Sequence, residues 1–188
     1  MKSGRMKSII WPVRVSLGIR ESSNPKSQSL ESSVLFNHES PLRRKEFVSR
    51  RITHGAALIA AGKSDRLVLG NLEALRDWSH VSDFVRAFRL MLEAESPEDY
   101  ILASGNVRSV RDFCEAAFSV VGLDYRLYVS ADPALHRPDF TTPRVGNPRK
   151  ARERLGWKPE VDFTHMVEEM VMNDLLEIQG EGRAMTTA

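Results

Sequence analysis

The sequence is poor in several features that would assign it to a class. It contains a single cysteine, Cys114, which cannot form an internal disulfide, and its five histidines lack the Cys-pair and His-pair spacing of structural zinc. No apolar run approaches the ~18 residues that a membrane-spanning helix needs. We therefore expect no membrane partner, no metal site and a reducing, cytoplasmic setting.

A second absence concerns phosphate binding. The 11 glycines nowhere follow the G-x-G-x-x-G or G-x-x-G-x-x-G pattern, in which a tight turn lets backbone N–H groups approach the pyrophosphate of a dinucleotide. The sequence therefore contains no complete dinucleotide site of that type.

Charge is neither strong nor evenly spread. The 27 Lys and Arg against 25 Asp and Glu give +2, and residues 1–33 alone carry +4, which leaves −2 for residues 34–188. That main part offers no obvious basic face, so we expect no nucleic-acid partner. Half of residues 22–33 are serine, a composition that buries too little apolar surface to offset its ordering entropy. We predict a disordered basic leader over residues 1–33.

The remaining sequence alternates short apolar runs with amphipathic segments, which predict strands and helices respectively. Ser109 with Asp112 matches an acidic capping box, Thr164 is the expected N-cap of the last helix, and glycines follow several helices. The expected helices cover residues 47–61, 81–92, 110–122, 150–155 and 164–178, and the expected strands cover residues 34–36, 67–69, 100–103 and 127–129. The alternation predicts an α/β fold with too few strands for a complete doubly wound sheet, and a tail that frays over residues 179–188.

Three stretches carry recognisable motifs. Residues 35–41 read LFNHESP, residues 70–83 read GNLEALRDWSHVSD, and residues 150–159 contain LGW. Together they resemble the carboxy-terminal half of GDP-mannose 4,6-dehydratase, an extended short-chain dehydrogenase/reductase, and the match runs collinearly over about residues 34–178. The Arg-Asp-x-x-His-x-x-Asp pattern occurs across nucleotide-sugar enzymes, whereas Asn-His-Glu-Ser-Pro is narrower and indicates the GDP-mannose branch.

The resemblance implies the last strands of a Rossmann-like sheet plus the small nucleotide-sugar-binding domain. The intact enzyme of that family uses NADP to oxidise GDP-mannose at C4, eliminates water across C5 and C6, and returns the hydride to C6, giving GDP-4-dehydro-6-deoxy-mannose. Its catalytic Tyr-x-x-x-Lys pair lies upstream of the matched region, and none of the three tyrosines here has a lysine four positions later. We therefore interpret the chain as a truncated lyase that is inactive alone.

The resemblance also carries over ligand contacts, four to the GDP-sugar and two to NADP: Asn37, Arg50, Arg76 and Arg137, and then His38 and Arg43. Arg76 is the strongest of them because a planar guanidinium grips a diphosphate through paired hydrogen bonds. The amide of Asn37 both donates and accepts, which suits a sugar or a phosphate. For Arg43 and Arg50, an ordinary solvated charge is the alternative.

Other positions in the motifs are expected to be structural or to depart from the family. Phe140 stands where the family commonly has a glutamate that accepts from the ribose, so ribose recognition is in doubt. We expect Asp77 to orient its loop or to pair with an arginine, and Trp78 to lie in the core. His80 and Asp83 begin a helix, where a carboxylate complements the dipole without any ligand.

Three alternatives stay open. The chain could be a non-catalytic subunit that docks onto an intact homologous dehydratase, or a different nucleotide-sugar epimerase or reductase of the same superfamily. It could also be a product that never folds stably, because missing strands expose sheet edges and apolar faces. Preference for GDP over UDP, complex formation with an intact dehydratase and a cooperative folded core separate these hypotheses.

Overall fold

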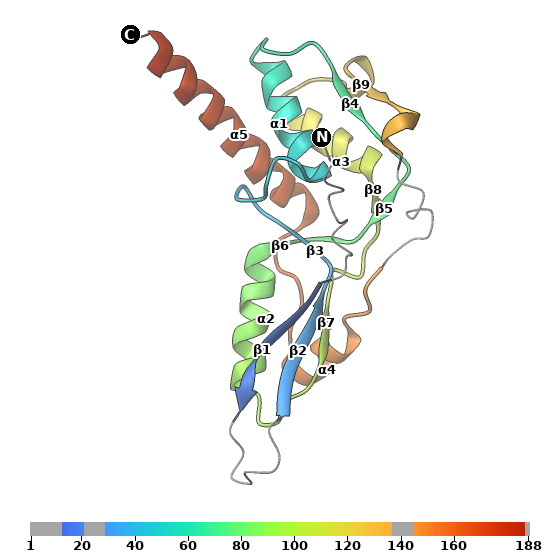
Figure 1. Cartoon of the computed structure of the whole chain (residues 1–188), viewed down its shortest axis with the longest axis vertical. Helices are drawn as coiled ribbons and strands as arrows, with labels where there is room; N and C mark the ends of the chain where they lie inside the picture. Colours follow the sequence, from blue (N-terminus) through green and yellow to red (C-terminus); the bar gives the residue numbers. More distant parts are fainter. Residues whose placement is uncertain (1–12, 21–28, 137–144, 187–188) are drawn as a thin grey trace, which may run out of the picture.

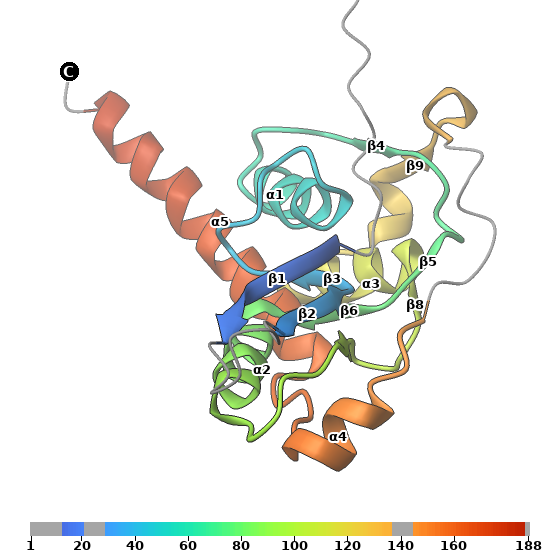
Figure 2. The same ribbon diagram turned by 60° about the horizontal axis from the view of Figure 1, so that its bottom comes forward.

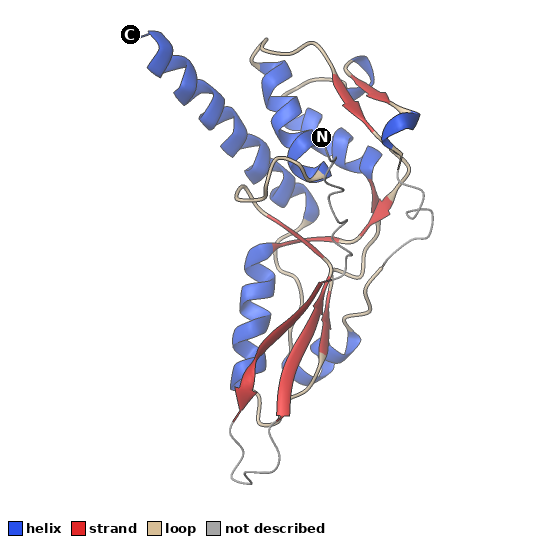
Figure 3. Cartoon of the chain, in the orientation of Figure 1, coloured by secondary structure: helices blue, strands red, loops and turns tan. Residues whose placement is uncertain are grey.

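The computed structural model describes residues 13–20, 29–136 and 145–186. It has a lower part built on a three-stranded sheet and an upper part of helices, joined by short two-stranded ladders (Figures 1 and 3). The described helices are α1 (Val48–Ala60), α2 (Val81–Glu93), α3 (Val110–Val120), α4 (Arg149–Leu155) and α5 (Phe163–Thr186), with 3₁₀ turns at Tyr125–Leu127 and Pro133–Leu135. The described strands are β1 (Val13–Arg20), β2 (Ser29–Leu35), β3 (Asn37–Glu39), β4 (Leu67–Leu69), β5 (Leu75–Arg76), β6 (Trp78–His80), β7 (Tyr100–Leu102), β8 (Arg108–Ser109) and β9 (Val129–Ala131).

The lower sheet has the strand order β1–β2–β7. β2 runs parallel to β7, with Leu35 opposite Leu102, and antiparallel to β1. α2 and α4 lie beside this sheet (Figure 2) and share one apolar core with it. The buried members of this core are Leu35, Phe84, Ala87, Met91, Tyr100, Leu102, Ala151 and Trp157.

The upper part packs α1, α3 and α5 around a second core. α3 begins with the predicted capping box, because Ser109 Oγ accepts from the Asp112 N–H at 3.0 Å and the Asp112 carboxylate accepts from the Ser109 N–H at 2.7 Å. Gly62 follows α1 with a positive φ of 67°, as a helix-ending glycine should. None of the described helices is long and apolar enough to cross a bilayer.

Three short ladders connect the two parts. β3 pairs in parallel with β6, β4 pairs in parallel with β9, and β5 pairs antiparallel with β8. The register places Asn37 opposite Trp78 and Arg76 opposite Arg108. The predicted α/β class with an incomplete sheet is confirmed, and most of the predicted ligand residues lie on or beside these ladders.

The structure differs from the prediction for residues 1–33, because β1 and the first half of β2 are ordered strands. β1 pairs with β2 along its length, and β7 pairs with it over residues 33–35, so neighbouring strands satisfy much of its backbone. Ser32 Oγ donates to the Asp99 carboxylate at 2.5 Å and accepts from the Arg14 guanidinium at 2.8 Å. Strand pairing and the contacts of Ser32 therefore order part of a serine-rich segment. Residues 1–12 and 21–28 of the predicted leader lie outside the described residues.

Three element boundaries also differ from the prediction. α5 continues to Thr186, past the expected fray at residue 179. Its first turn is capped by Asp162, whose carboxylate accepts from the His165 N–H at 2.9 Å, rather than by Thr164. The strand expected over residues 127–129 is a 3₁₀ turn followed by β9, since strand pairing with β4 begins only at Val129.

Candidate functional site

The loop between β5 and β6 is anchored by one buried carboxylate. Asp77 has no exposed surface and accepts four hydrogen bonds from neutral donors: the Ser104 N–H at 2.8 Å, the Ser104 hydroxyl at 2.6 Å, the Gly105 N–H at 3.0 Å and the Gly146 N–H at 3.2 Å. The Gly146 backbone can approach Ala103 this closely only because residue 146 is glycine: a Cβ there would stand 2.2 Å from the Ala103 Cβ. The expectation that Asp77 orients its loop is confirmed.

Two predicted GDP-sugar residues flank this anchor. Arg76, half-buried at the end of β5, donates from Nη1 to the carbonyl of Leu75 at 2.6 Å. Asn37, on β3, donates from Nδ2 to the backbone carbonyl of Asp77 at 3.1 Å. The structure therefore brings Asn37 and Arg76 to the same loop: Arg76 precedes Asp77 in the chain, and Asn37 bonds to the Asp77 carbonyl. A guanidinium and an amide, which are groups suited to an oxyanion and a sugar hydroxyl, thus both bond to the backbone of residues 75–77.

The residues next to this loop are structural, as expected. Trp78 is 4% exposed and packs edge-on against Phe113 at a centroid distance of 5.0 Å. His80 Nδ1 accepts from the Ser82 N–H at 3.3 Å and caps α2. The buried Asp83 carboxylate accepts from the backbone N–H groups of Glu160, at 3.0 Å, and Val161, at 3.3 Å. Asp83 thus fastens the segment before α5 to the start of α2.

The two predicted NADP residues lie on β3 and in the loop that follows it. Burial lowers the pKa of His38, and the neighbouring Arg43 lowers it further, so the imidazole is neutral at pH 7. Its ring contacts the ring of Phe84 at a centroid distance of 5.3 Å. The Arg43 guanidinium lies 3.7 Å over the ring of Phe47, and its Nε is 3.4 Å from a carboxylate oxygen of Glu39. Both side chains are engaged in contacts within the chain.

Glu39 is an unusual neighbour for this pair. Its carboxylate is 2% exposed and accepts from the Ser49 hydroxyl at 2.6 Å. Burial raises its pKa to about 7, although Arg43 and the Ser49 hydrogen bond both act to lower it. The desolvation of the charged form therefore outweighs the nearby cation. Because the group is enclosed, it is shielded from any ligand on the loop.

Arg50 faces another part of the molecule. Its side chain is 3% exposed, forms a close ion pair with the fully buried Asp174 and lies 3.8 Å from a carboxylate oxygen of Glu177. Its Nε donates to the carbonyl of Arg43 at 2.9 Å. The structure therefore does not bring Arg50 together with Asn37 and Arg76, because its guanidinium ties α1 to α5. Its assignment to the GDP-sugar stays a prediction without support from these contacts.

Arg137, the fourth predicted GDP-sugar residue, lies outside the described residues, as does Phe140. Residue 136 is the last described before this segment and residue 145 the first after it. The predictions for both positions therefore stay untested.

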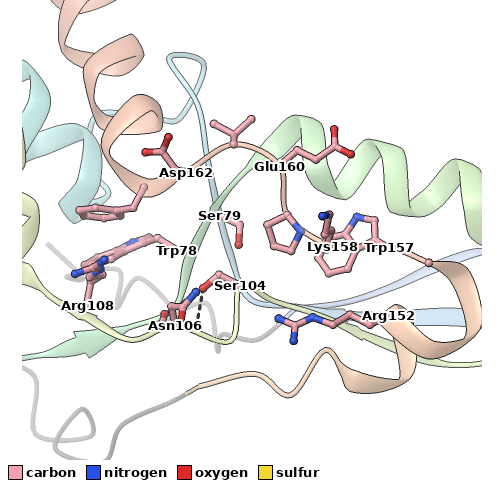
Figure 4. Close-up of a pocket in the computed structure, with 14 residues that line it drawn as sticks. Trp78, Ser79, Ser104, Asn106, Arg108, Arg152, Trp157, Lys158, Glu160 and Asp162 are labelled. Carbon is pink, nitrogen blue, oxygen red and sulfur yellow. Dashed lines mark hydrogen bonds between the residues drawn. The ribbon is translucent and has the colours of Figure 1, made fainter.

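A cavity of about 690 Å³ lies next to the anchored loop, between residues 104–108 and residues 156–163 (Figure 4). None of the five predicted ligand residues that the structure describes lines it. Its cations, Arg108, Arg152 and Lys158, were not singled out from the sequence. No sequence signal could have found them, because they belong to three separate elements and only the fold brings them to one cavity.

Comparisons with known proteins give a consistent result. A family model described as GDP-mannose 4,6 dehydratase matches residues 23–170. GDP-mannose 4,6 dehydratase 1 of Arabidopsis thaliana is 42% identical over 144 residues, which cover 77% of this chain and 40% of that protein. GDP-mannose 4,6-dehydratase of Sinorhizobium fredii is 39% identical over 166 residues, which cover 79% of this chain and 47% of that protein. The chain spans less than half the length of these relatives.

Solved structures share the fold at lower identity. A structure of RMD from Pseudomonas aeruginosa complexed with NADPH has a TM-score of 0.70 at 21% identity, covering 77% of this chain and 48% of that one. A dTDP-glucose 4,6-dehydratase from Bacillus anthracis in complex with NAD has a TM-score of 0.62 at 19% identity, covering 79% of this chain and 44% of that one. In both cases the described fold corresponds to about half of a larger chain.

Proposed function

Since the chain belongs to the GDP-mannose 4,6-dehydratase family, we propose that it is a substrate-binding portion of such an enzyme and holds the GDP part of a GDP-sugar. The ligand is GDP-mannose or GDP. The complete enzyme catalyses the NADP-dependent dehydration of GDP-mannose in the cytoplasm, and these residues alone do not.

The observation that carries the proposal is the anchored position of Arg76. Asp77 is satisfied by four neutral donors, so the backbone of the β5–β6 loop is held rigidly beside the amide of Asn37. A binding site gains affinity when its polar groups are already in place, because less entropy is lost on association. A guanidinium held in this way suits the paired oxygens of a diphosphate.

The described residues do not fit NADP by themselves. His38 is packed and neutral, and Arg43 is engaged with Glu39 and Phe47, so neither presents an unshared charge to a phosphate. The sequence also lacks the glycine-rich turn that approaches a dinucleotide pyrophosphate. We therefore propose nucleotide-sugar binding for this chain and assign no proton or hydride transfer to its residues.

Calorimetry with GDP and with UDP tests the proposal. We expect GDP to bind more tightly than UDP, and Arg76→Ala to weaken GDP binding by about 1.5–3 kcal/mol, the range for a hydrogen bond to a charged group. Arg66→Ala is the matched control, because Arg66 is exposed and lies outside the loop. Equal or undetectable binding of both nucleotides, in a sample shown to be folded by circular dichroism, would contradict the proposal.

The second hypothesis, docking onto an intact homologous dehydratase, stays a prediction. Its test is size-exclusion chromatography of the chain mixed with a full-length relative, where co-elution would favour it. The remaining hypothesis, a different nucleotide-sugar epimerase or reductase of the same superfamily, predicts the opposite nucleotide preference in the calorimetry where the substrate is a UDP-sugar. One enzyme of this kind, UDP-glucose 4-epimerase from Thermotoga maritima, shares the fold at 21% identity.

A further inference from the structure

The cavity of about 690 Å³ is lined by three cations, Arg108, Arg152 and Lys158, and by two carboxylates, so its lining is net positive. None of the three cations forms an ion pair within the described part of the chain. Its two acidic residues are already engaged, since Glu160 pairs with Arg86 and the Asp162 carboxylate caps α5. Figure 4 shows Arg108 on one side of the cavity and Arg152 with Lys158 on the other. The three cations therefore border the cavity without an ion pair to either of its carboxylates among the described residues.

A buried hydroxyl adds an independent observation. Ser79 lines the same cavity, is 3% exposed, and its Oγ has no hydrogen-bond partner. A buried polar group without a partner costs stability, so such groups are uncommon in folded proteins and call for an explanation. Figure 4 shows Ser79 in the middle of the lining, above Ser104 and Asn106. A bound acceptor in the cavity would satisfy this hydroxyl.

The rest of the lining favours a small organic molecule over a bare ion. The side-chain amide of Asn106 makes no hydrogen bond to the described residues, whereas Ser104 Oγ is already used by Asp77 and by the Asn106 N–H at 2.9 Å. Trp78, Pro159 and Phe163 supply apolar wall, and Arg108 lies 5.4 Å over the ring of Phe163. The volume lies within the range of pockets that hold small ligands, ~300–1,000 Å³.

We propose that this cavity binds a small molecule carrying a phosphate or diphosphate group. Arg108, Arg152 and Lys158 face the anionic oxygens, Ser79 and Asn106 donate to them, and the organic part lies against Trp78 and Phe163. Arginine and lysine are the usual partners of phosphate oxygens, and hydrogen bonds to a charged acceptor are about twice as strong as neutral ones. The site is separate from the proposed GDP-sugar site, because Asn37 and Arg76 do not line it.

Calorimetric titration of the full chain with inorganic pyrophosphate at low ionic strength tests this site. We expect saturable binding that is weakened about tenfold in Arg152→Gln and again in Lys158→Gln, since a hydrogen bond to a charged group accounts for roughly a decade in affinity. Arg154→Gln is the matched control. Arg154 is an equally exposed arginine on α4 that does not line the cavity, so its variant should keep the wild-type affinity.

Ser79→Ala gives a second readout that simple charge attraction would not move. It removes a hydroxyl that the free protein leaves unsatisfied, so the Tm of the unligated chain should rise while pyrophosphate binding weakens. A fall in both would identify Ser79 as a packing residue and overturn its role. Because Ser79 is buried, circular dichroism of the variant confirms that the two readouts refer to the same fold.

The outcomes also separate this site from the GDP-sugar site. Because pyrophosphate resembles the diphosphate that Arg76 is proposed to hold, the variants make the distinction: Arg76→Gln should weaken GDP binding and keep the pyrophosphate binding that Arg152→Gln weakens. No binding at millimolar pyrophosphate, an equal loss in Arg154→Gln, or a loss in Arg76→Gln but not in Arg152→Gln would each overturn the proposal. Binding of pyrophosphate that depends on Arg152 in a chain that fails to bind GDP would support the cavity and contradict only the proposed function.

Discussion

Two regions of the molecule bury carboxylates beside arginines, and they do so in opposite ways. In the β5–β6 loop, Asp77 is satisfied by neutral N–H and O–H donors. In the cluster between the β3 loop, α1 and α5, Glu39 lies against Arg43, and Asp174 is paired with Arg50. A carboxylate held by neutral donors needs no arginine for its own stability, whereas a carboxylate held by arginine uses that arginine as a structural partner.

This comparison explains why arginines in similar motifs differ in their prospects as ligand residues. Arg50 connects α1 to α5 from a site that is 3% exposed. Arg76 is half-buried on a loop whose acidic neighbour is satisfied elsewhere. The charge of a residue is therefore a weaker guide to ligand binding than the identity of the groups around it.

The largest effect on stability is expected when the ion pair between Arg50 and Asp174 is removed. Arg50→Ala leaves the buried Asp174 without its cation, so we expect the free energy of unfolding to fall by about 3–5 kcal/mol. GDP affinity of the remaining folded protein should not change. Urea denaturation measures the free energy of unfolding, and calorimetry measures GDP affinity. Arg51→Ala, at the neighbouring exposed arginine, is the control variant. A tenfold loss of GDP affinity with little loss of stability would restore Arg50 to the ligand site.

The second-largest effect is expected when the carboxylate of Asp77 is removed from its four neutral donors. Asp77→Ala leaves four donors without their acceptor, and we expect it to cost about 3 kcal/mol of unfolding free energy and to abolish GDP binding by releasing the loop of Arg76. Asp65→Ala, at an exposed aspartate, should change neither quantity. If Asp77→Ala kept wild-type affinity for GDP, the anchored loop would not be the basis of the site.

A pH titration sharpens the contrast between the two carboxylates. The pKa of Glu39 rises from the ordinary value of 4.5 to about 7 on folding, so the folded state holds its proton more tightly. Stability from this group is complete below about pH 4.5 and is lost as the pH rises to about 7, by roughly 2–3 kcal/mol.

Other groups titrate over the same range, so the measured quantity is the difference in unfolding free energy between wild type and Glu39→Gln. That difference should move in favour of the glutamine variant as the pH rises from 4.5 to 7.5. A difference that stays constant with pH would mean that Glu39 is ionised in the folded protein throughout, stabilised by Arg43.

The smallest effect concerns the start of α5. Asp162→Ala should lower the unfolding free energy by about 1 kcal/mol, because it removes the acceptor of the His165 N–H. Thr164→Ala, at the position that sequence periodicity favours as the cap, should change it by less than about 0.5 kcal/mol. Thermal unfolding of the two variants measures both, and the reverse order would place the helix start at Thr164.

Sequence periodicity was sufficient for the helices and insufficient for the short ladders. α1, α2 and α3 each bury three to five apolar residues on one face, and that spacing is visible in the sequence. β5 and β8 have two residues each, too few for any periodicity, so their pairing depends on the elements around them. β1 was missed because its partner strand is serine-rich and its order comes from pairing with neighbouring strands.

The candidate site shows the same limit. Asn37 and Arg76 were found through their motifs, and the fold brings them to one loop. The partner of Arg50 could not be predicted, because Asp174 lies more than a hundred residues away in sequence and nothing local marks it. The cations of the cavity are likewise separated in sequence, and the missing partner of Ser79 is visible only in three dimensions.

The central claim is that the chain keeps a GDP-sugar site and lacks the means to transform the sugar. NMR of GDP-mannose mixed with NADP and the purified, folded chain tests it most directly. We predict broadened or shifted guanine and mannose resonances, reversed by excess GDP, with no new sugar signals over time. The appearance of GDP-4-dehydro-6-deoxy-mannose would contradict the account, because it would require a proton-transfer group within these residues.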